Sequence, residues 1–126
     1  PLEKDTETSI ISQNTSKEMR KLLRKAVKEG TGWRADSLGY IVGGKTGTAE
    51  KLFNGDYDPN KTRASFVASF PMNDPTYTIF VMIDNPKSNS VNAVNTGGII
   101  SAPVASRIIE QIAPILQVIP SVNRDE

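Results

Sequence analysis

The sequence predicts an α+β fold in which helices flank an antiparallel sheet. Three apolar, β-prone segments follow one amphipathic helical pattern and precede another. Strands joined by short connections pair antiparallel, because parallel pairing needs a long crossover segment. With 126 residues, the chain has the length of one domain or of part of one.

The composition excludes several kinds of chemistry. The chain has neither cysteine nor histidine, which rules out thiol catalysis, a Ser-His-Asp triad and the usual zinc ligands within it. Its formal net charge is only +1, and no basic face is interleaved with aromatic residues. We therefore expect no metal site, no cofactor and no nucleic-acid partner. No apolar run reaches the roughly 20 residues that a membrane span requires.

A first helix is predicted from a start signal and an apolar face. Thr15-Ser16-Lys17-Glu18 fits a capping box, so we expect the helix to begin there and to end at Gly30. Ile10 and Ile11, just before it, are interpreted as the end of a strand. The apolar face consists of residues at helical spacing, namely Met19, Leu22, Leu23, Ala26 and Val27. The dense basic row on the same segment is interpreted as solvated and is given no function.

Three strands are expected after this helix. Their apolar and β-branched residues occur around Lys45, at residues 64–70 and at residues 77–83. Turn signals predict a polar loop at residues 53–62, which is either a rim beside a cleft or a variable surface hairpin. Residues 87–98, rich in Asn, Ser and Gly, are interpreted as an exposed loop.

Two further predictions concern packing. The lone Trp33 is interpreted as a packing anchor, as large aromatic residues often are. A last helix should begin near Ala102-Pro103, because proline is favoured in a first turn. It should pack on the sheet and kink or end at Pro114.

Lys45 lies in the most informative stretch, residues 40–50, where glycines bracket Lys45-Thr46 and open the backbone to a ligand. The spacing Gly39-x4-Gly44-Lys45-Thr46 fits a phosphate-binding loop, and residues 79–84 resemble a strand that ends in a magnesium-binding aspartate. Such a loop needs a strand before the first glycine and a helix that opens at the Lys-Thr pair. Here the β-prone residues lie inside the supposed loop, which disfavours a nucleotide-binding module.

The same letters match a second motif, the Lys-Thr-Gly box of serine acyl-transferases that act on D-alanyl peptides and β-lactams. That box belongs on a strand. Further short segments of the sequence match as well, namely Gly30-Thr31-Gly32, Ala64-Ser65-Phe66-Val67, Gly97-Gly98 and Ala102-Pro103-Val104. Over residues 11–120 the chain resembles the C-terminal part of class B penicillin-binding proteins, most of all the cell-division type that crosslinks septal peptidoglycan. The resemblance implies the C-terminal portion of a transpeptidase domain with the penicillin-binding/β-lactamase-like fold.

The resemblance implies roles for four residues. Lys45 would place its charge near the substrate's terminal carboxylate and the proton-transfer network, and the Thr46 and Thr48 hydroxyls would bind the same carboxylate. Gly47 would let a peptide or drug lie along the strand edge. The Thr48 backbone N–H would be one of two oxyanion-hole donors, each worth about 3 kcal/mol in the transition state. A solvated edge-strand lysine is the plainer interpretation of Lys45, but it does not explain the flanking glycines.

The attacking serine is expected outside this chain, which contains no Ser-x-x-Lys. The Ser-x-Asn matches at Ser12-Gln13-Asn14 and Ser121-Val122-Asn123 are interpreted as chance. We expect a polar arm or linker at residues 1–9, the transpeptidase portion at residues 10–120 and a polar tail at residues 121–126. The chain alone should therefore not turn over substrate.

The resemblance also implies partners for a longer parent protein. Peptidoglycan stem peptides and β-lactam antibiotics would bind the site, and the remainder of the transpeptidase domain would complete it. Division-complex proteins, including a glycosyltransferase, would bind the parent. An N-terminal anchor, absent from this chain, would hold the parent on the periplasmic side of the bacterial inner membrane. Besides the nucleotide-binding module, a noncatalytic scaffold that only keeps the fold is the remaining alternative.

Overall fold

The computed structural model of the chain describes residues 9–87 and 94–121. The elements in chain order are α1 (Gln13–Lys28), the 3-10 turn η1 (Trp33–Ala35), β1 (Gly43–Phe53), β2 (Asp56–Phe70), β3 (Tyr77–Asp84), α2 (Gly97–Ile100) and α3 (Ala102–Ile115). The polar arm and the polar tail predicted at the two ends lie almost wholly outside the described residues. None of the helices in the described part is long and apolar enough to cross a membrane.

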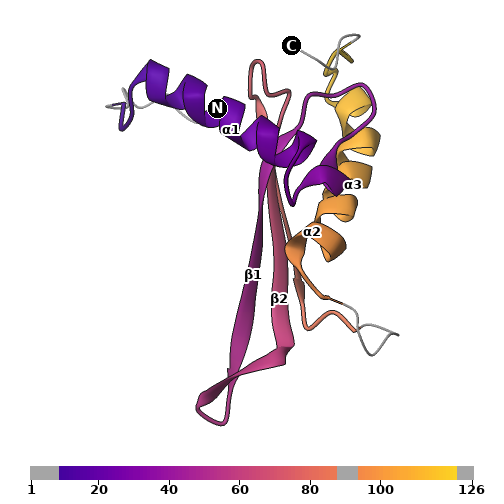
Figure 1. Cartoon of the computed structure of the whole chain (residues 1–126). Helices are drawn as coiled ribbons and strands as arrows, with labels where there is room; N and C mark the ends of the chain where they lie inside the picture. Colours follow the sequence, from indigo (N-terminus) through magenta and orange to yellow (C-terminus); the bar gives the residue numbers. More distant parts are fainter. Residues whose placement is uncertain (1–8, 88–93, 122–126) are drawn as a thin grey trace, which may run out of the picture.

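The three strands form one antiparallel sheet in the order β1-β2-β3. This confirms the predicted fold class, an antiparallel sheet with helices against it. α2 and α3 lie on one side of the sheet, and α1 crosses near the end where β1 begins (Figure 1). β1 and β2 continue past β3 as a two-stranded hairpin that projects away from the helices (Figure 1).

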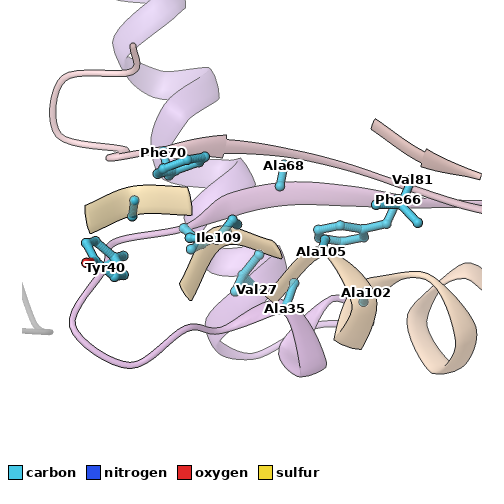
Figure 2. Packing of buried hydrophobic residues seen from close by; sticks show 12 residues of the cluster. Val27, Ala35, Tyr40, Phe66, Ala68, Phe70, Val81, Ala102, Ala105 and Ile109 are labelled. Atoms are coloured by element: carbon cyan, nitrogen blue, oxygen red, sulfur yellow. The ribbon is translucent and has the colours of Figure 1, made fainter. Parts of the chain in front are cut away.

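The core lies between the sheet and α3. Phe66 and Phe70 of β2 point from the sheet toward Ile109 of α3, with Val27 of α1 close by (Figure 2). α3 presents small side chains at helical spacing, Ala102, Ala105 and Ala113, and these let the helix approach the sheet closely. Pro114 is the penultimate residue of α3, so the predicted end of this helix is confirmed.

The other face of the sheet carries apolar side chains that are exposed to solvent. Alternation along the strands turns Phe66 inward and Val67 outward, where Val67 lies opposite Phe80. Val67, Phe80 and Met82 are all exposed in the described structure. The described structure therefore leaves an apolar face of the sheet uncovered on this side.

The start of α1 differs from the prediction. The helix begins at Gln13, and the Ser12 hydroxyl caps it by accepting a hydrogen bond from the Thr15 amide at 3.0 Å. The predicted capping box at Thr15 is therefore wrong by three residues, because Ser12 supplies the cap earlier. Ile10 and Ile11 lie in a bend and not in a strand. Of the predicted apolar face, Val27 is buried, whereas Met19 and Leu22 are exposed.

The loop predicted at residues 53–62 is largely strand. β1 extends to Phe53 and β2 begins at Asp56, so only Asn54-Gly55 forms the turn. Both turn residues have positive φ angles, 52° for Asn54 and 92° for Gly55, as two-residue hairpin turns require. The turn signal at Asn54-Gly55 is confirmed, but the polar residues after it continue the hairpin.

Candidate active site

All four residues predicted for the site lie on β1, at the edge of the sheet. Lys45, Thr46, Gly47 and Thr48 pair on one side with β2, from Val67 to Ala64. Within residues 9–87 and 94–121 no strand lies on the other side. Because Lys45-Thr46 continues a strand instead of opening a helix, the geometry of a phosphate-binding loop is absent here.

Thr46 is held by a residue from a distant part of the chain. The Thr31 and Thr46 hydroxyl oxygens are 2.9 Å apart, and Thr31 follows the end of α1. The Lys45 ammonium donates to the Thr46 carbonyl oxygen at 2.9 Å and to its hydroxyl oxygen at 3.3 Å. Since an ammonium can only donate, the Thr46 oxygen is an acceptor here, and its own proton can be donated to a ligand.

Thr31 was missed as a site residue in the sequence. The signal was present, because Gly30-Thr31-Gly32 was among the matching segments, but nothing in the sequence placed Thr31 beside Thr46. The Gly32 amide donates to the Ala26 carbonyl oxygen at 3.0 Å and folds the turn back on the end of α1, and Thr31 in this turn meets Thr46 of β1.

Thr48 is oriented by the start of α2. The Gly97 amide donates to the Thr48 hydroxyl oxygen at 3.0 Å. A hydroxyl that accepts from a backbone amide keeps its own proton for another acceptor. The Thr48 side chain is thus a fixed donor beside the Thr46 side chain.

Gly97 reaches Thr48 only because it has no side chain. A Cβ atom at Gly97 would collide with the carbonyl oxygens of Ser65 and Gly47. A Cβ atom at Gly47 would lie 2.5 Å from the Ser65 hydroxyl oxygen. The sequence placed Gly97 and Gly98 in an exposed loop; that prediction is wrong, because both are buried against the sheet and begin α2.

The threonines surround a cavity of about 420 Å³. Its lining combines hydroxyl groups with apolar walls and consists of Thr31, Trp33, Thr46, Thr48, Thr96, Gly98 and Ile99. Trp33 is 61% exposed and lies under the Arg34 guanidinium, 5.0 Å from the ring centre, so the packing-anchor interpretation is wrong. Hydroxyl donors beside a lysine ammonium form a site suited to a carboxylate.

The Asp84 carboxylate is contacted by two basic side chains, those of Lys51 and Arg63. The Lys51 ammonium lies 3.1 Å and the Arg63 Nε atom 3.4 Å from the Asp84 Oδ1 atom. The hydrogen bond from Lys51 lowers the pKa of the Asp84 carboxyl below its ordinary value. In the described part of the chain no three His, Cys, Asp or Glu residues group as metal ligands.

A second hollow, about 510 Å³, lies beside α1 and is lined mostly by its basic side chains. Lys21 pairs with Glu18 at 2.8 Å, and Arg24 pairs with Asp36 at 2.8 Å. None of the residues predicted for the site lines this hollow. The solvated-face interpretation therefore holds for Lys21, whereas it is wrong for Arg24, whose side chain is only 13% exposed and also donates to the Val42 carbonyl oxygen.

Comparison with known proteins gives a consistent family assignment. The family model described as "penicillin binding protein transpeptidase domain" matches residues 3–110. Stage V sporulation protein D of Bacillus subtilis is 41% identical over 117 residues, which cover 93% of this chain and 18% of that protein. A probable peptidoglycan D,D-transpeptidase FtsI of Caulobacter vibrioides is 41% identical over 124 residues, covering 86% of this chain and 20% of that protein.

Solved structures agree with these sequence relatives. The transpeptidase domain of penicillin-binding protein 3 from Burkholderia pseudomallei superposes with a TM-score of 0.78 at 38% identity, covering 90% of this chain and 33% of that one. Penicillin-binding protein 3 of Mycobacterium tuberculosis, complexed with ampicillin, superposes with a TM-score of 0.77 at 29% identity, covering 92% of this chain and 27% of that one. The chain spans about a fifth of the length of the Bacillus and Caulobacter relatives.

Proposed function

The chain belongs to the penicillin-binding protein transpeptidase family, and from this premise we propose that β1 forms one wall of the acyl-transfer site of a peptidoglycan D,D-transpeptidase. The observation that carries the proposal is the grouping of Lys45, Thr46 and Thr48 on an open strand edge beside a hydroxyl-lined cavity. A cation and directed hydroxyls at one place favour a carboxylate ligand over a neutral one.

The reaction requires a nucleophile that another part of the parent supplies. A serine hydroxyl attacks the carbonyl carbon of the penultimate D-alanine and gives up its proton. The peptide bond breaks, the terminal D-alanine leaves as a protonated amine, and an ester remains. An acceptor amine then attacks the ester carbonyl carbon and forms the new amide bond, the ester C–O bond breaks, and a proton from the attacking amine restores the serine hydroxyl. A β-lactam acylates the same serine, but its leaving nitrogen stays attached after the ring opens.

The residues of this chain bind and orient the donor in that scheme. The Thr46 and Thr48 hydroxyls donate to the terminal carboxylate, and Lys45 supplies the positive charge beside them. Thr31 fixes the Thr46 hydroxyl from the other side. Gly47 leaves the strand edge open for pairing with an extended peptide. The Thr48 backbone N–H serves as an oxyanion-hole donor, where its fixed position stabilises developing charge.

The wider setting is proposed from the relatives and concerns the longer parent. The Caulobacter relative is named as an FtsI-type transpeptidase and the Bacillus relative as a sporulation protein. We place the parent among the transpeptidases of division-type wall synthesis, anchored at the periplasmic side of the inner membrane. Its partners are stem peptides, β-lactams and division-complex proteins, including a glycosyltransferase.

Covalent labelling tests this function. A fluorescent penicillin should label the full-length parent and leave the 126-residue chain unlabelled, because the chain lacks a Ser-x-x-Lys nucleophile. Absence of labelling in a folded parent would contradict the transpeptidase proposal, and labelling of the chain alone would contradict the external serine. ATP binding that disappears in Lys45→Ala would favour the nucleotide-binding alternative.

A further inference from the structure

α1 restricts the direction in which a bound ligand can extend from the carboxylate site, the group formed by Lys45, Thr46 and Thr48. The Arg24 guanidinium of α1 donates to the Val42 carbonyl oxygen at 2.9 Å, just before β1 begins. Gly43 and Gly44 are buried there. From Thr48 onward, by contrast, β1 is largely exposed up to Phe53. Along β1, the described structure therefore leaves a ligand anchored at Thr46 and Thr48 an open strand only toward the tip of the β1–β2 hairpin.

This restriction also sets the polarity of the ligand. A peptide whose C-terminal carboxylate lies at Thr46 and Thr48 has its N-terminal part toward Phe53. Because β1 runs from Gly43 to Phe53, such a peptide lies antiparallel to it. Leu52 lies four positions after Thr48, which corresponds to roughly 13 Å of extended chain. The sugar-linked end of a short stem peptide therefore lies at the hairpin tip.

The tip carries an exposed apolar pair on the appropriate face. Leu52 lies at an even offset from Thr46 and Thr48, so alternation along β1 places the three side chains on one face, and the register of β1 with β2 shifts between Glu50 and Lys51. Lys51, the residue before Leu52, points to the opposite face of β1, where its ammonium contacts Asp84. Leu52 lies directly opposite Tyr57 of β2, and the two are 66% and 67% exposed.

The other face of the tip is occupied by contacts within the chain. The Lys61 ammonium lies 3.2 Å from the centre of the Phe53 ring, and it also lies 3.8 Å from an Asp58 carboxylate oxygen. The salt bridge from Lys51 to Asp84 ties the base of the hairpin to β3. These contacts hold the ribbon while the Leu52 and Tyr57 side chains stay free for a ligand.

We propose that Leu52 and Tyr57 form a subsite for the sugar-linked end of the donor stem peptide, an inference that rests on the function proposed above. A pyranose ring presents an apolar C–H face and polar hydroxyls at its rim. The Tyr57 ring and the Leu52 side chain offer a matching apolar surface, and the Tyr57 hydroxyl can hydrogen-bond to a sugar hydroxyl. The subsite selects donors that are still attached to the glycan.

Two donor substrates separate this subsite from the carboxylate site. The full-length parent is assayed with a free peptide ending in D-alanyl-D-alanine and with the same peptide amide-linked to a peptidoglycan disaccharide. In the double variant Leu52→Ser and Tyr57→Ser, kcat/KM should fall about tenfold for the disaccharide-linked donor. It should stay unchanged for the free peptide and for acylation by penicillin. Both replaced side chains are exposed in the described structure, so the fold should tolerate the change.

The controls keep the outcomes distinct. Tyr57→Phe keeps the aromatic face and should retain most of the preference for the disaccharide-linked donor. Ile119→Ser removes an exposed aliphatic side chain far from the hairpin in sequence, and it should leave kcat/KM unchanged for both donors. Equal losses on both donors, or no loss on the linked donor, would overturn the subsite. A wild-type parent that neither reacts with penicillin nor processes the free peptide would instead overturn the proposed function.

Discussion

The Gly97 amide donates to the Thr48 hydroxyl oxygen at 3.0 Å and thereby joins α2 to the strand that carries Lys45. The two residues are far apart in sequence, and the contact depends on the missing side chain at Gly97. Helix packing and hydroxyl orientation are therefore coupled at this point. A change that moves α2 should also disturb the carboxylate site.

Replacing Gly97 with alanine tests this coupling. The new methyl group would collide with the Ser65 and Gly47 carbonyl oxygens, so the free energy of unfolding should fall by about 1–3 kcal/mol. Urea denaturation measures the loss, and Thr96→Ala is the matched control because its side chain makes no capping hydrogen bond. Equal stability of Gly97→Ala and wild type would mean that α2 does not pack as described.

Thr31 is expected to act through Thr46. Thr31→Val removes the hydroxyl but keeps the shape of the side chain, and the rate of penicillin acylation of the parent should fall about three- to tenfold. Thr31→Ser should restore it, because the hydroxyl returns. Thr76→Val is a control, since that hydroxyl donates only to the Asp74 carbonyl oxygen in a distant turn. A normal rate in Thr31→Val would remove Thr31 from the site.

The Lys51–Asp84 pair predicts a direction of pH dependence. The hydrogen bond from Lys51 lowers the pKa of Asp84 in the folded chain. A lowered folded-state pKa means that the pair stabilises the fold above the unfolded-state pKa, near pH 4, and that this contribution is lost as the pH falls through the folded-state value. In Lys51→Met, NMR titration should show a higher pKa for Asp84. An unchanged value would show that Lys51 is not its partner in solution.

The cap of α1 distinguishes the structure from the sequence prediction. Ser12→Ala should lower the free energy of unfolding by about 1 kcal/mol, because the Thr15 amide loses its acceptor. Thr15→Ala, which removes the hydroxyl that the predicted capping box would place at the helix start, should change stability less. Thermal melting of the two variants gives the comparison. A larger loss for Thr15→Ala than for Ser12→Ala would favour the later helix start.

The sequence predicts the strands and the motif because both are local patterns. The β-prone residues around Lys45 were enough to place it on a strand and to disfavour a phosphate-binding loop. Likewise the apolar and β-branched run of β3 and the proline in α3 act over a few residues. These elements needed no knowledge of distant contacts.

The errors concern features that depend on contacts distant in sequence. Gly97 appeared to belong to an exposed loop, since glycine-rich segments are usually loops, and only packing against Ser65 explains its burial. Thr31 and Thr46 are 15 residues apart, and nothing local indicates that their hydroxyls meet. Of the two alternatives for residues 53–62, the surface hairpin agrees with the structure, but the sequence does not predict how far its strands extend, because polar residues conceal the pairing of Leu52 with Tyr57.

The rate of acylation of the full-length parent by a fluorescent penicillin, compared between wild type and Lys45→Met, tests the central claim most directly. Methionine keeps the length and apolar stem of the lysine but removes the charge. If Lys45 serves the acyl-transfer site, the second-order rate constant should fall by about a hundredfold or more, while circular dichroism stays unchanged. An unchanged rate constant would contradict the account and favour a solvated edge-strand lysine.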